Sequence, residues 1–356
     1  MSQTLLVTGG AGFIGANFIL DAIARGKRVV NLDALTYAGV LANLASVEKN
    51  ERYTFVHGDI RDRALVDSIL TKHKPDAIVH FAAESHVDRS IDGPDIFVST
   101  NVLGTLCLLN AVRAYTGTGK SLRFLHVSTD EVYGSLGPTG YFTEESRVEP
   151  NSPYSASKAA SDHLVRAYHH TYGLDAVTTN CCNNYGPYQF PEKLVPLMIL
   201  NALEAKPLPV YGDGMQRRDW IFVRDHCAGV ALALEKGRSG ETYVLGARAE
   251  AANLDMVHLV CDLVEERRPA KENEALRKQG LGSYRELVRY VTDRPGHDRR
   301  YAIDPKKSET ELGFAPKTTL RQALGETIDW YLANLSWCQD INEKRYARER
   351  LGGKTQ

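Results

Sequence analysis

The sequence predicts an α/β protein whose main domain is a doubly wound, mostly parallel β-sheet. Three observations support this fold class. Apolar runs of strand length alternate with helical patterns in the first half of the chain, a glycine-rich turn joins the first strand to the first helix, and small or polar residues directly follow the strands. Such residues gather at the carboxyl edge of an open parallel sheet, where ligands bind. We therefore expect a ligand-binding crevice at that edge.

Length, charge and cysteine content limit the alternatives. The chain has 356 residues, enough for a large core and about two domains. Its 43 Lys and Arg residues balance 44 Asp and Glu residues, so charge favours neither nucleic acid nor a membrane as a partner. Six scattered cysteines show neither metal-ligand nor disulfide spacing. We expect a soluble cytoplasmic protein without a metal, a targeting segment or an apolar run of membrane-spanning length.

The first strand and helix have the pattern of a dinucleotide-binding site, typical of a Rossmann-type sheet. Residues 4–8 form a strand-like run, the glycines of residues 9–15 follow, and a helical pattern continues to Ile23. The glycines permit a tight turn and close approach of a pyrophosphate, and the helix N-terminus supplies N–H donors. The next strand ends in Asp33, an acid that would accept the ribose hydroxyls and repel a 2′-phosphate. The predicted cofactor is therefore NAD, not NADP.

Two later strand ends are further candidates for cofactor contact. Asp59 follows the strand-like residues 53–57, where it could meet the adenine amino group, although a simple turn aspartate fits the spacing equally well. Ala82 and Ala83 follow the fourth strand and are small enough for a cofactor to pass close by. A helix from about residue 94 to 115 comes next, and it is a candidate for packing on the sheet or for a dimer face.

The fifth strand, at residues 124–127, leads into a short polar stretch that begins Ser128-Thr129-Asp130-Glu131. Adjacent carboxylates repel each other, so at least one pKa should rise and the pair could divide into an acid and a base. A lone Asp-Glu pair after a strand is more often a solvated turn. A catalytic interpretation therefore depends on the rest of the chain.

A second candidate pair follows on the next helix. Ser152 and Pro153 predict its N-cap and first position, and Tyr154 and Lys158 then share one helix face. A nearby ammonium group lowers the pKa of a phenol, so we expect Tyr154 to transfer protons. One such spacing is expected by chance among 17 tyrosines, but its position after an NAD-binding half-fold favours a catalytic role.

Taken together, these motifs resemble the extended short-chain dehydrogenase/reductase family. The glycines of residues 9–15, Asp33, the Ser128-Thr129 pair and the Tyr154/Lys158 pair carry the resemblance. Within that family, four segments are similar to the dTDP-glucose 4,6-dehydratases, namely residues 82–90, 128–134, 183–188 and 294–300. Related epimerases and decarboxylases usually lack the Asp-Glu pair. The resemblance extends from residue 4 to about residue 337.

The resemblance implies a homodimeric, NAD-dependent lyase that acts on a dTDP-sugar. Tyr154 would take the 4-hydroxyl proton of dTDP-glucose as hydride leaves C4, and Thr129 would hydrogen-bond the developing carbonyl. Glu131 would remove the C5 proton, a protonated Asp130 would assist loss of the 6-hydroxyl, and hydride would return to C6. The alternatives are another sugar-nucleotide dehydratase or epimerase (UDP-, CDP- or GDP-sugar) and an NAD-sensing protein without turnover. An epimerase has no use for the carboxylate pair, and a sensor has no use for Tyr154 and Lys158.

The same resemblance assigns three sets of residues. The expected catalytic residues are Thr129, Asp130, Glu131, Tyr154 and Lys158. The expected cofactor-binding residues are Gly9, Gly12, Phe13, Ile14, Gly15, Asp33, Leu35, Thr36, Asp59, Ile60, Phe81, Ala82, Ala83, Ser85, Thr100, Ser128, Tyr154, Lys158 and Asn184. The expected substrate-binding residues are Ser85, Thr129, Asn183, Lys193, Leu194, Pro209, Tyr211, Arg218, Asn253, Arg294 and His297.

The second half of the chain is expected to interleave with the first. The strand–helix rhythm breaks at residue 185, and glycine, proline and aromatic residues cluster there. We expect an NAD-binding domain of residues 1–184 plus about 221–247, and a smaller α/β sugar-nucleotide domain of about 185–220 plus 248–336. A polar C-terminal tail would occupy residues 337–356. Residues 267–284 are charged and contain helix breakers, which predicts a mobile surface excursion.

Overall fold

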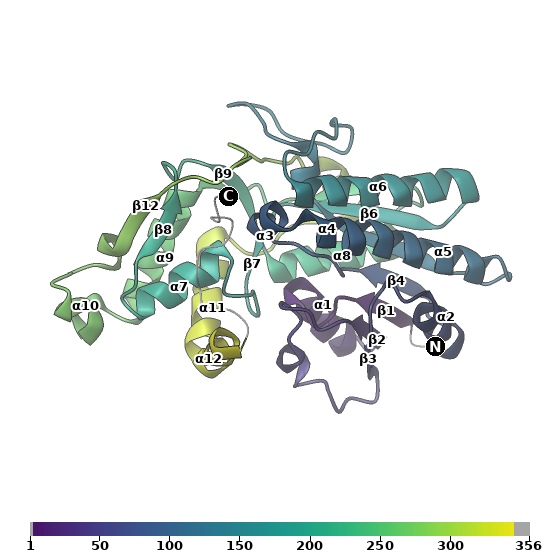
Figure 1. Cartoon of the computed structure of the whole chain (residues 1–356), viewed down its shortest axis with the longest axis horizontal. Helices are drawn as coiled ribbons and strands as arrows, with labels where there is room; N and C mark the ends of the chain where they lie inside the picture. The colour runs from purple at the N-terminus through teal and green to yellow at the C-terminus, as the bar shows by residue number, and fades with distance from the viewer. Residues whose placement is uncertain (1–2, 345–356) are drawn as a thin grey trace.

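The computed structural model describes residues 3–344 and contains one large sheet and two small ones (Figure 1). The large sheet has seven parallel strands in the order β10-β6-β5-β4-β1-β2-β3. These strands are β1 Thr4–Thr8, β2 Arg28–Asp33, β3 Tyr53–His57, β4 Ala77–His80, β5 Arg123–Thr129, β6 Ala176–Cys181 and β10 Thr242–Leu245. The strand order reverses beside β1, which is the doubly wound arrangement. The predicted fold class is confirmed.

Helices cover both faces of this sheet, because alternate residues of each strand point to opposite faces. Leu5 and Val7 of β1 belong to one apolar core with residues of α1 and α8, whereas Leu6 belongs to another with residues of α2, α5 and α6. The bounds are α1 Phe13–Ala24, α8 Val223–Lys236, α2 Arg63–His73, α5 Thr105–Thr116 and α6 Pro153–Tyr172. The predicted start of α6 is confirmed, since Ser152 Oγ accepts from the Ser155 N–H at 3.1 Å and Pro153 is the first helical residue.

The helix that precedes β5 contains a longer apolar segment than the sequence suggested. It consists of α4 Pro94–Phe97, a π-helical turn η2 Val98–Gly104 and α5. Over residues 94–116 it is 23 residues long and apolar enough to cross a membrane by length and composition alone. It is the one such helix among residues 3–344, and 44% of its most apolar window is buried within the protein. The expectation that no apolar segment reaches this length is wrong, although buried helices of soluble proteins pass the same test.

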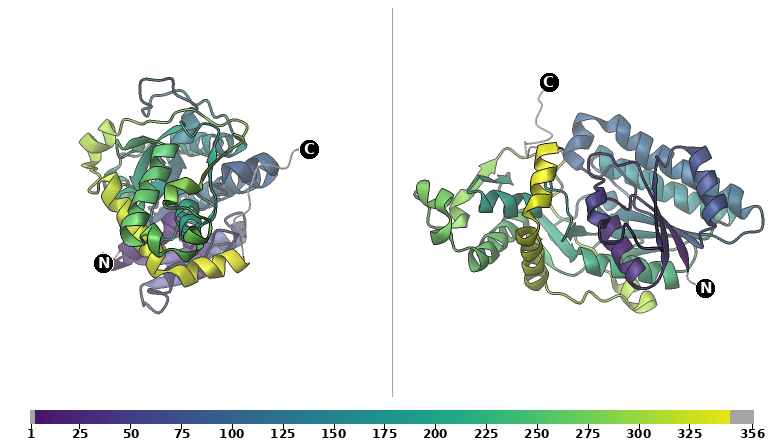
Figure 2. Two further views of the ribbon diagram at one scale, coloured as in Figure 1. Left: turned by 90° about the vertical axis from the view of Figure 1, so that its left-hand side faces the viewer. Right: turned by 90° about the horizontal axis from the view of Figure 1, so that it is seen from below.

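The remaining strands form a smaller region beside the large sheet (Figure 2). A three-stranded sheet contains β7 Asn183–Tyr185, β9 Arg217–Phe222 and β11 Glu250–Ala252, and a parallel pair contains β8 Leu208–Tyr211 and β12 Val288–Val291. The helices packed there are α7 Leu194–Leu203, α9 Asn253–Arg267 and α11 Leu320–Ala333. Between β9 and β11 the chain returns to the large sheet as α8 and β10. The proposed domain boundaries stay a prediction.

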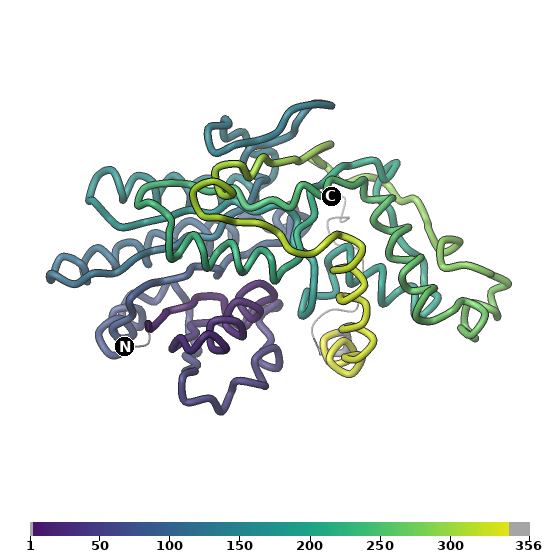
Figure 3. Tube along the Cα trace, turned by 180° about the vertical axis from the view of Figure 1, so that it is seen from behind, coloured from purple at the N-terminus to yellow at the C-terminus, as the bar shows by residue number. Residues whose placement is uncertain are grey.

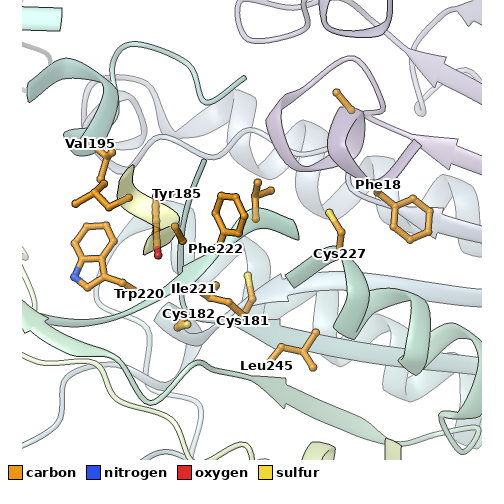
Figure 4. Packing of buried hydrophobic residues seen from close by; sticks show 14 of the residues in the cluster. Phe18, Cys181, Cys182, Tyr185, Val195, Trp220, Ile221, Phe222, Cys227 and Leu245 are labelled. Atoms are coloured by element: carbon orange, nitrogen blue, oxygen red, sulfur yellow. The ribbon is translucent and has the colours of Figure 1, made fainter. Parts of the chain in front are cut away.

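One apolar core joins the two regions. Figure 4 shows Trp220, Tyr185 and Phe222 in the same cluster as Cys227 of α8 and Phe18 of α1. The cluster therefore extends from the helices on the large sheet to the strands of the smaller region. A shared, close-packed core holds its members at fixed distances. Loops from both regions can consequently contribute to a single site.

Residues 267–287 are better packed than the sequence suggests. They form η4 Ala270–Glu272, α10 Glu274–Lys278 and η5 Tyr284–Leu287, and they bury Ala270, Leu276, Tyr284 and Leu287. Asn273 Nδ2 also donates to the Leu203 carbonyl at 3.0 Å. The expectation of a loose surface excursion is wrong, because apolar residues between the helix breakers anchor the segment.

The expected polar tail is also partly structured. The helix α12 Leu335–Lys344 follows α11, and both are the yellow C-terminal helices of Figure 3. Trp337 Nε1 donates to Asn43 Oδ1 at 2.9 Å, from η1 Leu41–Leu44, and Ile341 packs with Val40 and Phe190. Residues 337–344 are therefore helical, and Trp337 and Ile341 pack against the protein, which the prediction of a polar tail did not anticipate. The rest of the predicted tail, residues 345–356, lies outside the described residues.

Candidate active site

A cleft with a volume of about 330 Å³ follows the carboxyl ends of β1, β2, β4, β5 and β6. All five predicted catalytic residues line it, as do all predicted cofactor-binding residues except Leu35. Of the predicted substrate-binding residues, Ser85, Thr129, Asn183 and Lys193 line it. The other seven, described below, lie outside its wall. The crevice expected at a switch point of the strand order is therefore present, with the predicted residues gathered around it.

The glycine turn after β1 brings two backbone segments into direct contact. Gly9 has φ +71°, and a Cβ added to it would lie 2.6 Å from the backbone of Ala82. A Cβ on Gly15 would lie 2.3 Å from the Gly9 carbonyl oxygen. Gly12 is the N-cap of α1 and provides no side-chain cap, so N–H groups of the first turn are left for a ligand. This arrangement suits the pyrophosphate of a dinucleotide.

Asp33 connects this turn to the loop after β2. Its carboxylate accepts from the Ala11 N–H and from the Leu35 N–H, both at 2.8 Å. Leu35 has φ +50°, a left-handed conformation that turns its N–H toward Asp33. Leu35 itself does not line the cleft, so its predicted cofactor contact stays a prediction. Asp33 is 7% exposed and lines the cleft, as an acid that receives a ribose must.

Asp59 lies in the cleft wall next to a cation that sequence analysis did not assign. Arg61 Nη2 lies 2.6 Å from Asp59 Oδ2, and this hydrogen bond lowers the pKa of Asp59. The carboxylate is therefore ionised and already paired. This geometry fits the turn interpretation of Asp59 and leaves its predicted contact with adenine a prediction.

Asp130 begins the short helix η3 Asp130–Tyr133, immediately after β5. It is 1% exposed, and its Oδ1 accepts weakly from Thr129 Oγ1 at 3.4 Å, while Oδ2 is buried without a hydrogen-bond partner among the described residues. Burial, and then the charge of Glu131, raise the pKa of Asp130 well above its ordinary value. This environment favours the protonated form of the carboxyl, which is the form that can donate a proton.

Glu131 has a different environment, although it is the next residue. Burial raises its pKa, but Arg294, Arg218 and Lys193 all act in the opposite direction. Those three cations favour the ionised form, which is the form that a base requires. The adjacent carboxyls thus have different environments, one desolvated and one near three cations, and their roles as acid and base stay a prediction.

Tyr154 and Lys158 lie together on α6. Within this chain the pKa of the phenol is raised, so the expectation that Lys158 lowers it is wrong. Burial raises the pKa of Tyr154 well above its ordinary value, the charge of Glu131 raises it further, and a hydrogen bond with Thr129 lowers it. Lys158 Nζ donates to the Val127 carbonyl at 2.9 Å, and burial lowers the pKa of Lys158 itself. The ammonium group is therefore committed to the backbone of β5.

Asp162 lies one helical turn after Lys158 and contacts three residues next to the site. It accepts from Ser128 Oγ at 2.9 Å and from Asn180 Nδ2 at 3.1 Å, and it lies 3.1 Å from His126 Nε2. Asp162 also raises the pKa of Lys158, opposing the effect of burial. The sequence contained a signal for this role, because Asp162 is four residues after Lys158 on the same helix face.

Three predicted substrate-binding cations converge on Glu131 from different segments. Lys193 Nζ donates to the Ser85 carbonyl at 3.0 Å, Arg218 Nη2 donates to the Asp298 carbonyl at 2.8 Å, and Arg294 Nη1 lies 2.7 Å from Asp88 Oδ1. Lys193 lines the cleft, whereas Arg218 and Arg294 are not among its lining residues. The cluster can attract an anionic substrate next to the base.

The other predicted substrate-binding residues surround this cluster without lining the cleft. Tyr211 O–H donates to Asp88 Oδ2 at 3.2 Å, and its ring lies edge-on to that of His297. His297 lies 2.6 Å from Asp293, and burial, the largest influence, lowers its pKa to about 4. The remaining three are Leu194 at the start of α7, Pro209 in β8 and Asn253 at the start of α9. Their contacts with substrate stay predictions.

Two buried amides in the cleft wall point to a polar ligand. The side-chain oxygens of Asn183 and Asn184 are buried and have no hydrogen-bond partner among the described residues. Both residues line the cleft at β7. Because buried polar atoms are nearly always paired, these oxygens are candidate acceptors for ligand hydroxyl or amide groups. Among residues 3–344, no group of three or more His, Cys, Asp or Glu side chains is arranged to hold a metal ion.

Comparison with known proteins agrees with this geometry. The family model described as GDP-mannose 4,6 dehydratase matches residues 6–327. A Xanthomonas campestris dTDP-glucose 4,6-dehydratase is 58% identical over 354 residues, covering 98% of this chain and 99% of the relative. A Neisseria meningitidis relative of the same name is 51% identical over 357 residues, covering 98% and 99%. The chain belongs to this family of extended short-chain dehydrogenases/reductases.

A solved member of the family has the same fold. It is the Streptomyces venezuelae dTDP-glucose 4,6-dehydratase DesIV, solved with NAD and TYD bound, which is 48% identical with a TM-score of 0.85. The similarity covers 95% of this chain and 100% of that one. The resemblance inferred from the sequence motifs is therefore confirmed.

Within this family's fold, the cleft of the present chain contains residues that sequence analysis did not assign. They include Tyr37, Arg61, Cys181, Gln189, Phe190 and Glu192. Arg89 connects two of them, since its guanidinium lies 4.0 Å from the centre of the Tyr37 ring and 3.0 Å from Glu192 Oε2. No local pattern reveals this contact, because Tyr37 follows β2 and Glu192 precedes α7.

Proposed function

We propose that this protein is an NAD-dependent lyase that converts dTDP-glucose into dTDP-4-keto-6-deoxy-glucose and water without net redox change. The observation that carries the proposal is the contrast between Asp130, which is buried with Oδ2 unpaired among the described residues, and Glu131, whose ionised form three cations favour. Elimination of water across C5 and C6 requires a base at C5 and an acid at the departing hydroxyl, whereas an epimerase shares the oxidation by Tyr154 but has no use for this carboxyl pair. The names of the relatives support the same choice.

The cofactor would be NAD, held by the glycine turn and by Asp33. The backbone contact between Gly9 and Ala82 leaves no room for larger side chains, and the carboxylate of Asp33 would repel a 2′-phosphate. Bound NAD would supply the hydride acceptor and return the hydride in each turnover. Solved relatives with NAD bound support this assignment.

The chain's own residues would then move three protons. Tyr154 would take the proton of the 4-hydroxyl, and Thr129, its hydrogen-bond partner, would also donate to the developing carbonyl. Because the chain itself raises the pKa of Tyr154, bound ligands must lower it for this step. Glu131 would remove the proton at C5, made acidic by the 4-ketone, and Asp130 would protonate the departing 6-hydroxyl. Glu131 would then return its proton to C5 as the hydride adds to C6.

We further propose that the protein is a cytoplasmic homodimer. The helix of residues 94–116 exposes Ile96, Val98 and Leu103, at 44%, 50% and 54%. An exposed apolar stripe on a helix favours association with a second copy over a membrane, because the same helix buries its other face in the core. Substituting Leu103→Glu should shift the mass measured by light scattering from dimer to monomer. A wild-type protein that is itself monomeric would contradict the proposal.

The reaction is tested by incubating the purified protein with dTDP-glucose or with UDP-glucose and analysing the sugar nucleotides by mass spectrometry. We expect loss of one water from dTDP-glucose without added NAD. Recovery of an isomer without loss of mass would favour an epimerase. Faster loss of water from UDP-glucose would assign a different nucleotide, and recovery of both substrates unchanged would favour a protein without turnover.

A further inference from the structure

Asp88 uses both oxygens of its carboxylate to hold two residues of the smaller region. It lies on the short helix α3 Val87–Asp92, and it is 4% exposed. Oδ1 is 2.7 Å from Arg294 Nη1, and Oδ2 accepts from the Tyr211 O–H at 3.2 Å. Tyr211 ends β8 and Arg294 follows β12, the parallel partner of β8. One buried carboxylate therefore fixes two neighbouring parts of the smaller region.

The position of α3 gives this contact its importance. The helix follows β4 of the large sheet, after the cleft residues Glu84 and Ser85. Figure 1 places α3 between the large sheet and the smaller region around β8 and β12. Asp88 consequently acts across the boundary between the cofactor side of the cleft and the substrate side.

Arg294 needs a fixed counter-charge at this place. Like-charged neighbours surround it, since the charge of Arg294 lowers the pKa of both Lys193 and Arg218. A guanidinium held among cations is repelled unless an acid compensates it, and Asp88 is the acid in direct contact. The Nε of Arg294 is buried without a hydrogen-bond partner among the described residues. That donor points to a ligand contact that the protein itself does not satisfy.

From these contacts we infer that Asp88 is a positioning residue that orients Arg294 and Tyr211 for the nucleotide diphosphate end of the substrate. The inference rests on the proposed function. Asp88 itself touches no substrate atom in this scheme and takes no part in proton transfer. Asp88 holds the Arg294 guanidinium in one orientation. A diphosphate oxygen can then bind to it without a change in the side-chain conformation.

The test compares Asp88→Asn and Asp88→Glu with the wild type. We measure the NAD content of the purified protein, kcat and KM for dTDP-glucose, and Kd for dTDP by calorimetry. For Asp88→Asn we expect Kd and KM to rise roughly 10-fold or more, the scale of losing a hydrogen bond to a charged group. The loss in kcat/KM should come mainly through KM, NAD content should match the wild type, and Asp88→Glu should recover part of the binding.

Tyr211→Phe provides a milder variant that removes one hydroxyl and keeps the ring. If Tyr211 acts through Asp88, its removal should weaken dTDP binding in the wild type but have a smaller effect in the Asp88→Asn background. The matched control is Asp329→Asn, whose carboxylate pairs with Arg267 on the exposed surface. This control should bind dTDP as the wild type does.

Two results would overturn the inference. One is an unchanged Kd for dTDP in Asp88→Asn, and the other is a loss of NAD that parallels the loss of kcat, which would indicate a general structural role. Failure of the proposed function is a separate result, because the wild type would then release no water from dTDP-glucose. Binding of dTDP by calorimetry does not require turnover, so the two failures are distinguishable.

Discussion

The two sides of the cleft are built in different ways. On the cofactor side, Gly9, Gly15 and Asp33 come from consecutive strand–turn units, and backbone contacts fix them. On the substrate side, Lys193 and Arg294 come from distant segments, and each is held by a group from the other region, Ser85 or Asp88. The cofactor side is thus determined by local geometry, whereas the substrate side depends on contacts between regions. Substitutions in the glycine turn or at Asp33 should therefore leave dTDP binding unchanged, whereas substitutions at the contacts between regions should weaken it.

The two catalytic carboxyls lie where these sides meet. Asp130 is buried against the end of β5, and Glu131 faces the cations of the substrate side. The same pair of neighbours in the sequence therefore receives opposite electrostatic environments. Substitutions at Asp130 and Glu131 should therefore produce the largest effects on activity.

The largest effect is expected for the pair Glu131→Gln and Asp130→Asn, with NAD content unchanged in both. Glu131→Gln should still oxidise C4 but should lose exchange of the C5 hydrogen with solvent deuterium. Asp130→Asn should keep that exchange, while loss of water slows by roughly 10² to 10⁴, the range for removing a general acid. Exchange is measured by mass spectrometry in deuterated buffer.

The two carboxyls are coupled, so both variants should be compared across pH. In the wild type, activity should fall as pH drops through the pKa of Glu131, which must be ionised. It should also fall as pH rises through the pKa of Asp130, which must be protonated. Wild-type exchange in Glu131→Gln, or loss of exchange in Asp130→Asn, would show that the roles are assigned wrongly.

The next effect is expected at Tyr154. Tyr154→Phe should reduce turnover roughly 10²-fold or more, the usual scale for losing a general base, because the first oxidation has no proton acceptor. The cap and the packing of α6 do not involve the hydroxyl, so the protein should fold and bind dTDP normally. Near-normal turnover, followed at the same NAD content, would make Tyr154 structural.

Sequence analysis succeeded where the chemistry is local. The glycine turn, Asp33 and the Ser152 cap each lie within a few residues of the element they define, so spacing alone located them. It failed where contacts between distant segments, or burial, determine the position or the pKa of a side chain. The positions of Leu276, which is buried, and of Trp337, which is partly buried, depend on partners elsewhere in the chain, and the phenol of Tyr154 responds to burial more than to the neighbouring lysine. Asp88 and Arg89 lie in residues 82–90, one of the segments that carry the resemblance, but only the fold reveals their partners Arg294 and Glu192.

A smaller effect is expected on the cofactor side. Asp33→Asn keeps an acceptor for only one of the two backbone N–H groups, because the amide nitrogen cannot accept, and it removes the charge that would exclude a 2′-phosphate. We expect retention of NAD to fall by about 10-fold, the scale of one hydrogen bond to a charged group, and NADP to bind more readily. Nucleotides released by denaturation identify the bound species, and calorimetry should show unchanged affinity for dTDP. NADP as the dominant nucleotide of the wild type would contradict the role of Asp33.

The last expected effect is on the free energy of unfolding, because keeping Asp130 protonated in the folded state costs stability as pH rises. In the unfolded chain its pKa has the ordinary value of 3.8, and in the folded chain the pKa is well above it. Between the two values the folded state holds a proton that the unfolded state releases, so the wild type loses stability as pH rises through this window. Asp130→Asn has a similar shape and cannot ionise, so the penalty disappears. The variant should be more stable than the wild type near neutral pH, by roughly 1.4 kcal/mol for each pH unit above 3.8 over which folded Asp130 stays protonated. The difference should shrink toward pH 4, where both states of the wild type bind the proton.

Thermal unfolding from pH 4 to pH 8 measures this difference, with Asp329→Asn as the exposed control. A constant difference at all pH values would show that Asp130 is ionised in the folded protein and could not serve as the acid.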